Sequence, residues 1–178
     1  AWDTSSVTAM DFMFHDAYAF NQDIGGWAVH SVRNMQHMFV ETSSFNGDIG
    51  AWDTAGVTDM IGMFAAAIAF DQDISGWTVD SVTDMSYMFW GASAFDQDLG
   101  WCVDDGVNLD NAFDGTLCAS ALCGVSWGGC DIPSDGNVMA NGKIRIAVAA
   151  WLSDATSAEA TYGHISTWAT GGVTDMKS

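Results

Sequence analysis

Large apolar residues recur every 25 positions through the first two thirds of the chain. Tryptophan marks the period at Trp2, Trp27, Trp52 and Trp77, and Trp101 follows after 24 residues. Each of the first four tryptophans is followed by a valine, a Met-x-x-Met-Phe group, a second phenylalanine and an Asp-Ile or Asp-Leu pair. A fixed period of this length is typical of architectures in which each unit stacks on its neighbours. Residues 1–113 are therefore predicted to form a solenoid of five repeats.

Two different spacings occur inside one repeat. Met10, Met13, Phe14 and Ala17 fall at i, i+3, i+4 and i+7, the pattern of a short amphipathic helix. Trp27 and Val29 alternate as in a half-buried strand. The predicted fold is thus an α/β solenoid of the leucine-rich-repeat type, with one short strand and one short helix or turn per repeat. A purely β coil, with turns in place of the helices, is the alternative.

Two segments carry a family resemblance. The strings AFNQDIGGWAVHSVRNMQHMF, over residues 19–39, and VTDMSYMFWGASAFDQDLGWCV, over residues 82–103, resemble the repeats of BspA-like surface proteins. The F-N-x-D-I-x-x-W and V-T-x-M-x-x-M-F motifs recur in register. This resemblance implies a leucine-rich-repeat-like solenoid used at surfaces for adhesion or interaction, with no shared catalytic residues to transfer.

All four cysteines lie close together just after the regular repeats, at Cys102, Cys118, Cys123 and Cys130. Their even number and clustering favour a disulfide-stapled segment in an oxidising compartment, although three pairings are open. A zinc site is disfavoured, because the cluster contains neither a CxxC pair nor a histidine. We expect residues 114–132 to form a C-terminal cap over the last repeat, with the cysteine cluster beginning at residue 102.

The last part of the chain returns to the repeat pattern. Residues 133–164 are expected to be a linker and a helical cap. In residues 165–178 the spacing of the repeat begins again, and the hypothesis is that a further solenoid turn starts there. Two explanations stay open: the chain is one module of a tandem polyprotein, or separate chains join head to tail. A stray final strand on the same domain is the other interpretation. The residues expected to take part in assembly are Trp2, Val7, Met10, Ile165, Trp168, Val173 and Met176.

The charge of the chain restricts its partners. Its 23 acidic and four basic residues give a formal net charge of -19. Nucleic acid is therefore not expected as a partner, and anionic lipid surfaces are disfavoured, because both require clustered Lys and Arg. No apolar run approaches the roughly 18 residues of a membrane span, so membrane insertion is not expected. We expect a secreted or cell-surface protein.

An Asp row is the one constellation with metal chemistry. Asp23, Asp48, Asp73 and Asp98 recur in register, each two residues after an Asn or Asp. Stacked carboxylates repel one another unless a cation screens them, so calcium is a candidate ligand. The alternative is that each Asp caps its own turn by accepting backbone N–H bonds. No other cofactor is expected.

No catalytic motif is present, and the four histidines occupy unrelated repeat positions. The chain is thus predicted not to be an enzyme. The predicted function is an extracellular structural or adhesive repeat module that assembles head to tail, or as a tandem polyprotein, into a linear fibre or surface coat. The alternative is a carbohydrate- or ice-binding module that uses a repeated polar face of Ser and Thr.

Overall fold

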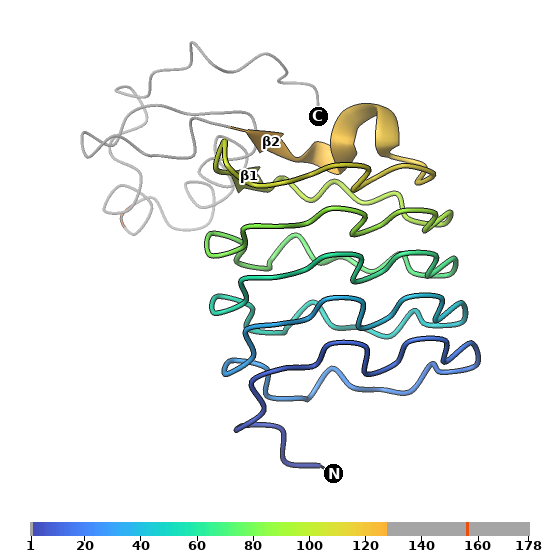
Figure 1. Cartoon of the computed structure of the whole chain (residues 1–178), viewed down its shortest axis with the longest axis vertical. Helices are drawn as coiled ribbons and strands as arrows, with labels where there is room; N and C mark the ends of the chain where they lie inside the picture. Colours follow the sequence, from blue (N-terminus) through green and yellow to red (C-terminus); the bar gives the residue numbers. More distant parts are fainter. Residues whose placement is uncertain (1, 128–155, 157–178) are drawn as a thin grey trace.

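The computed structural model describes residues 2–127 and residue 156. Residues 2–127 run through a stack of similar turns, each about one repeat long, which we call coils (Figure 1). Parallel bridges connect each coil to the next, from Ala9 to Asn34, Asp59, Asp84 and Asn108 in succession. The bridge spacing is 25 residues for three steps and 24 for the last, the same as the spacing of the tryptophans. One sequence repeat therefore makes one coil.

A ladder of backbone hydrogen bonds holds neighbouring coils together. The N–H groups of residues 10, 12, 14 and 16 donate to the carbonyls of residues 34, 36, 38 and 40 in the next coil, at 2.9–3.1 Å. The N–H groups between them, of residues 13, 15 and 17, donate to carbonyls three residues earlier. The same alternation recurs from residue 35, from residue 60 and from residue 85. Bonds along a coil and bonds between coils together satisfy these backbone donors.

The structure differs from the helix expected over residues 10–17. Every second bond of this segment leaves the coil, whereas an α-helix keeps all of its bonds within the segment. Two residues per coil have the left-handed backbone conformation, Phe12 and Asp16 in the first coil, with φ of 56° and 59°. Their equivalents are His37, Glu41, Gly62, Ala66, Tyr87, Gly91, Asn111 and Gly115. Over residues 2–127 the structure contains no α-helix, and the strand expected at residues 27–29 is not formed.

The last described residues continue the stack. Strand β1 (Cys102–Val103) pairs in parallel with strand β2 (Ser126–Trp127), and the 3-10 helix η1 (Ala119–Gly124) lies between them in the sequence (Figure 1). Leu99 N–H donates to the Cys123 carbonyl at 2.8 Å, and Ser126 N–H donates to the Trp101 carbonyl at 2.9 Å. The Cys118–Cys123 disulfide closes this segment. Residues 117–127 thus cover part of the preceding coil.

The core consists of columns of identical residues. Phe39 stacks between Phe14 and Phe64, with ring centroids 5.4 and 5.5 Å apart. A second column runs through Phe20, Phe45, Phe70 and Phe95, and a third through Trp52, Trp77 and Trp101. Because each coil places the same side chain at the same height, the phenylalanines of the second and third coils have a stacking partner on both sides. This packing explains why single repeats bury their apolar residues only within a stack.

Candidate assembly interface

The first coil exposes apolar residues whose counterparts in inner coils are buried. Trp2 is 73% exposed, whereas Trp52 is 3% exposed. Met13 is 39% exposed, whereas Met63 is fully buried; Phe12 is 49% exposed, close to the 46% of its equivalent Tyr87. Of the other predicted assembly residues, Val7 is half-buried and Met10 is buried. The first coil therefore presents an apolar cross-section of the stack.

Unused hydrogen-bond acceptors lie on the same side. The carbonyls of Ala9, Asp11, Met13 and His15 hold the positions at which inner coils accept the ladder bonds. Among the described residues, no donor bonds to these four carbonyls. We call them, together with Trp2, Phe12 and Met13, the first-coil face. Within the described residues it forms one edge of the ladder.

The two ends of the ladder are complementary. At the far end, the N–H groups of Leu109, Asn111, Phe113 and Gly115 are the equivalents of the donors at residues 10–16. They too lack an acceptor within the described part of the chain. At these four positions one end of the ladder offers acceptors and the other offers donors, whereas one further bond per coil runs the other way, as from Arg33 N–H to the Thr8 carbonyl. An unpaired edge of this kind is a template for another chain segment.

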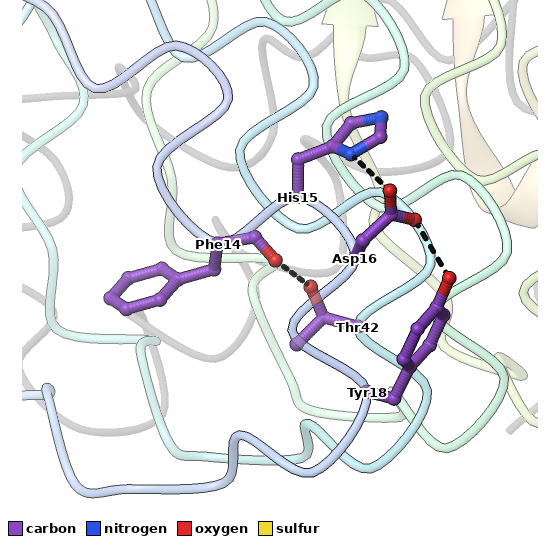
Figure 2. Close-up of polar contacts among 5 residues, drawn as sticks. All are labelled: Phe14, His15, Asp16, Tyr18 and Thr42. Carbon is purple, nitrogen blue, oxygen red and sulfur yellow. Dashed lines mark hydrogen bonds and ion pairs between the residues drawn. The ribbon is translucent and has the colours of Figure 1, made fainter.

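Polar side chains line the rim of the first coil, as Figure 2 shows. His15 Nδ1 lies 3.1 Å from Asp16 Oδ2, and the Tyr18 hydroxyl donates to Asp16 Oδ1 at 3.2 Å. This bond and the negative charge of Asp16 raise the pKa of Tyr18. Thr42 Oγ1 donates to the Phe14 carbonyl at 2.7 Å, which ties the rim to the second coil. An apolar centre with a polar rim is the usual anatomy of a protein interface.

The comparison with known families agrees with the extent of the coils. Residues 1–53 and 25–121 match the family described as "Mycoplasma protein of unknown function, DUF285". The chain belongs to the DUF285 family. No curated protein and no solved structure is significantly similar to it.

The Asp row of this DUF285 chain caps turns. The carboxylates of Asp23, Asp48 and Asp73 each accept the N–H two residues later, at 3.0–3.1 Å. Hydrogen bonds from the Ser75 side chain and backbone lower the pKa of Asp73. The fourth residue of the row, Asp98, lies against Gly124. Within residues 2–127, no group of three or more His, Cys, Asp or Glu side chains is placed to hold a metal ion. The geometry favours the capping interpretation, and calcium stays a hypothesis without support from it.

The residues that precede this row form a second column. Asn46 N–H donates to Asn21 Oδ1, Asp71 N–H to Asn46 Oδ1, and Asp96 N–H to Asp71 Oδ1, at 2.9–3.0 Å. Each side chain here accepts the backbone N–H of its own equivalent one coil later. Asn and Asp at these positions therefore join coils, a role that their spacing alone did not indicate.

Several of the Ser and Thr hydroxyls that recur along the DUF285 repeats already hydrogen-bond within the protein. Thr58 Oγ1 donates to the Arg33 carbonyl at 3.1 Å, and Thr83 Oγ1 donates to the Thr58 carbonyl at 3.2 Å. Ser31 and Ser81 also donate to carbonyls of the preceding coil. Each of these hydroxyls donates its single hydrogen to a carbonyl of the protein. They keep lone pairs for a ligand but no free donor.

The structure describes only some of the other residues that the sequence singled out. Cys118 and Cys123 form a disulfide, and Cys102 is also disulfide-bonded. Cys130, Ile165, Trp168, Val173 and Met176 lie outside the described residues, as do nearly all of residues 133–164. No helix of the described residues is long and apolar enough to cross a bilayer. The acceptor edge of the first coil has no signature in the sequence, because it consists of backbone atoms.

Proposed function

We propose that this DUF285 chain is an extracellular structural or adhesive repeat module that assembles head to tail into a linear fibre or surface coat. The observation that carries the proposal is the contact between successive coils, in which parallel bridges and a ladder of backbone hydrogen bonds join one repeat to the next. The same contact buries the apolar side chains of both coils, so a coil without a neighbour exposes apolar surface, which marks interaction sites in soluble proteins. The partner that fits best is a further coil of the same repeat.

The complementary ends favour a linear arrangement. Contact between a donor end and an acceptor end is heterologous, and such contacts give rings when the rotation closes and filaments when it does not. The coils in Figure 1 stack with little change of direction, which supports open growth. A tandem polyprotein would use the same contact within one chain.

The fold class and the surface location belong to the same proposal. Stacked coils, parallel bridges and the family match support a solenoid related to BspA-like repeats. The alternation of turn bonds and ladder bonds favours the coil built of bridges and turns over the version with helices. Disulfides at Cys102 and between Cys118 and Cys123 suit an oxidising, extracellular compartment.

Sedimentation velocity of the purified chain over a range of concentrations tests the proposal. We expect the sedimentation coefficient of the wild type to rise with concentration, and Met13→Asp to abolish the rise because it buries a charge in the contact. Ile68→Asp is the matched control: Ile68 is exposed in an inner coil, which has a described neighbour on each side, so the same added charge should leave assembly unchanged. A wild type that stays monomeric throughout, or a Met13→Asp variant that assembles normally, would refute the proposal.

Carbohydrate binding is the second candidate. Tyr87 and Trp90 are both about half exposed on one turn of the fourth coil, where Trp90 N–H donates to the Tyr87 carbonyl. Exposed aromatic rings offer an apolar body and a polar tip to a ligand. Binding of soluble oligosaccharides, measured by quenching of tryptophan fluorescence and lost in Trp90→Ala, would favour this candidate.

A further inference from the structure

We propose that a pocket between the first two coils binds a neutral sugar through adjacent ring hydroxyls. The pocket is a cavity of about 500 Å³, open to solvent and within the usual size range of small-molecule sites. Two equivalent segments line it, with Asn21, Gln22, Asp23, Gly25 and Gly26 from the first coil and Asn46, Gly47, Asp48 and Ala51 from the second. This inference is independent of head-to-tail assembly and of the surface that contains Tyr87 and Trp90.

A missing glutamine opens this pocket. The residue after the Asn or Asp that joins coils is glutamine in the first, third and fourth coils, but it is Gly47 in the second. Gln72 Nε2 donates to Asn46 Oδ1 at 2.9 Å, and Gln97 Nε2 donates to Asp71 Oδ1 at 2.7 Å. These glutamines therefore lie across the contact with the preceding coil. Gly47 has no side chain that could do so, and the contact between the first two coils stays uncovered.

A hydrogen-bond acceptor is left open at the same place. Asn46 Oδ1 accepts two bonds, from the Asp71 N–H and from Gln72 Nε2. Within the described residues, the equivalent Asn21 Oδ1 accepts only the Asn46 N–H, at 2.9 Å. An amide oxygen has two lone pairs, so Asn21 Oδ1 can accept one further bond. The donor that it lacks is the one that a glutamine in place of Gly47 would supply.

The groups around the pocket can both donate and accept. Asp23 and Asp48 each use one carboxylate oxygen to cap a turn, and the other oxygen remains an acceptor. The amide N–H donors of Asn21, Gln22 and Asn46 bond to no other group in the described part of the chain. A sugar hydroxyl donates one hydrogen and accepts others, so two adjacent hydroxyls can use a carboxylate and an amide together. Bonds to an ionised carboxylate are the stronger kind.

Charge and donor pattern disfavour the other classes of ligand. Two carboxylates in a chain of net charge -19 repel phosphates and acidic sugars. A metal ion is disfavoured because residues 2–127 place no group of three or more His, Cys, Asp or Glu side chains to hold one. An organic cation would use the carboxylates and leave the amide N–H donors without a role. A neutral ligand with hydroxyls uses both kinds of group.

Titration of the full chain with methyl glycosides, followed by the backbone amide signals in NMR spectra, tests the pocket. The probes are the methyl glycosides of glucose, mannose and galactose, each of which has adjacent ring hydroxyls. We expect at least one of them to shift the signals of Gly25, Gly26 and Gly47. The corresponding analogue without the middle ring hydroxyl has no adjacent pair and should shift none. Absence of shifts with all three glycosides, or equal shifts with the analogue, would overturn the inference.

Gly47→Gln closes the pocket with the residue that the repeat itself uses. A Cβ at this position would lie 3.0 Å from the Phe45 ring. Gln72 follows Phe70 in the same way, so a coil can accommodate this side chain. We expect Gly47→Gln to keep the melting temperature of the wild type and to weaken sugar binding by about tenfold or more, because the new amide takes the place of the ligand at Asn21 Oδ1. Binding as tight as that of the wild type would contradict the site.

Two further variants separate the loss of the pocket from the added bulk. Gly76→Gln adds the same side chain in the third coil, outside the pocket and with room for a Cβ, so it should bind the sugar like the wild type. Gln72→Gly removes the glutamine that covers the next contact between coils. It should create a second site, seen as shifts at Gly50 and Gly76. A Gln72→Gly variant that binds sugar at one site only would overturn the role assigned to the glutamine.

Two other results would assign the ligand or the site differently. Arginine methyl ester is the cationic probe, and shifts at Gly25 and Gly47 with it but with none of the glycosides would indicate a cation site. Sugar binding that is lost in Trp90→Ala and kept in Gly47→Gln would place the sugar on the surface of the fourth coil. Either result would overturn the inference.

Discussion

Replacing one methionine by alanine at two equivalent positions should have unequal consequences. Met13 and Met63 occupy the same place in the repeat, but Met13 is 39% exposed on the first-coil face and Met63 is fully buried between two coils. The chemical change is identical in Met13→Ala and Met63→Ala. The difference between the two losses of unfolding free energy therefore measures how much a neighbouring coil stabilises the buried methionine.

The expected magnitudes follow from burial. Truncating a fully buried methionine leaves a cavity and costs about 2–5 kcal/mol of unfolding free energy. Met63 belongs to the same buried core as the stacked rings of Phe39 and Phe64, and close packing there restricts collapse around the cavity. At Met13 part of the side chain already contacts water and the site can relax outward, so we expect a loss of less than about 1 kcal/mol.

Urea unfolding at low micromolar protein concentration, followed by circular dichroism, is the appropriate assay. The slope of the free energy with urea should be the same in both variants, since each unfolds the same surface. The two losses should add in the double variant, because the sites are two coils apart. Equal losses at Met13 and Met63 would show that the first coil is already covered, and would refute the open face.

Three further predictions concern charge, metal and disulfide. Burial raises the pKa of Asp84, but hydrogen bonds from Ser86 and Asn108 outweigh it and hold the pKa below its ordinary value. The carboxylate therefore contributes stability above about pH 4 that is lost as the pH falls through the lowered pKa. Asp84→Asn keeps an acceptor without titrating, so the wild type should lose more stability than this variant between pH 5 and pH 2 in urea titrations; parallel losses would contradict the assignment. Chelation of calcium should leave the melting temperature unchanged, because the carboxylates of the Asp row accept backbone bonds; a fall on chelation would restore the calcium hypothesis. Replacing Cys118 and Cys123 together by serine should cost about 2 kcal/mol, the loop-closure value for so short a loop, as measured by urea unfolding of the oxidised proteins; a loss of the whole transition would mean that this disulfide holds the entire stack.

The period of the coils could be predicted from the sequence, whereas their internal path could not. The recurrence of Trp27, Trp52 and Trp77 gives the step at which the bridges join coils, because identical residues contact each other only at equal intervals. The helical spacing of Met10, Met13 and Phe14 had another cause. Alternating turns and left-handed residues bring the same positions inward, and the neighbouring coil accepts the backbone bonds that a helix would have kept.

Some side-chain roles could be predicted from the sequence, and others depend on how the coils stack. That Asp48 caps a turn follows from residue type and position, since Asp bonds readily to an N–H two residues later. The ladder through Asn21, Asn46 and Asp71 depends on coil stacking and appears only in three dimensions. The open carbonyls beside Trp2 likewise depend on which coil has a neighbour.

Fibre diffraction from aligned assemblies of the full chain tests the central claim most directly. Coils stacked along the fibre and joined by parallel bridges predict a reflection near 4.8 Å along the fibre axis, the spacing of adjacent strands. Assemblies in which this reflection lies across the axis, or is missing, would contradict growth by the addition of coil upon coil.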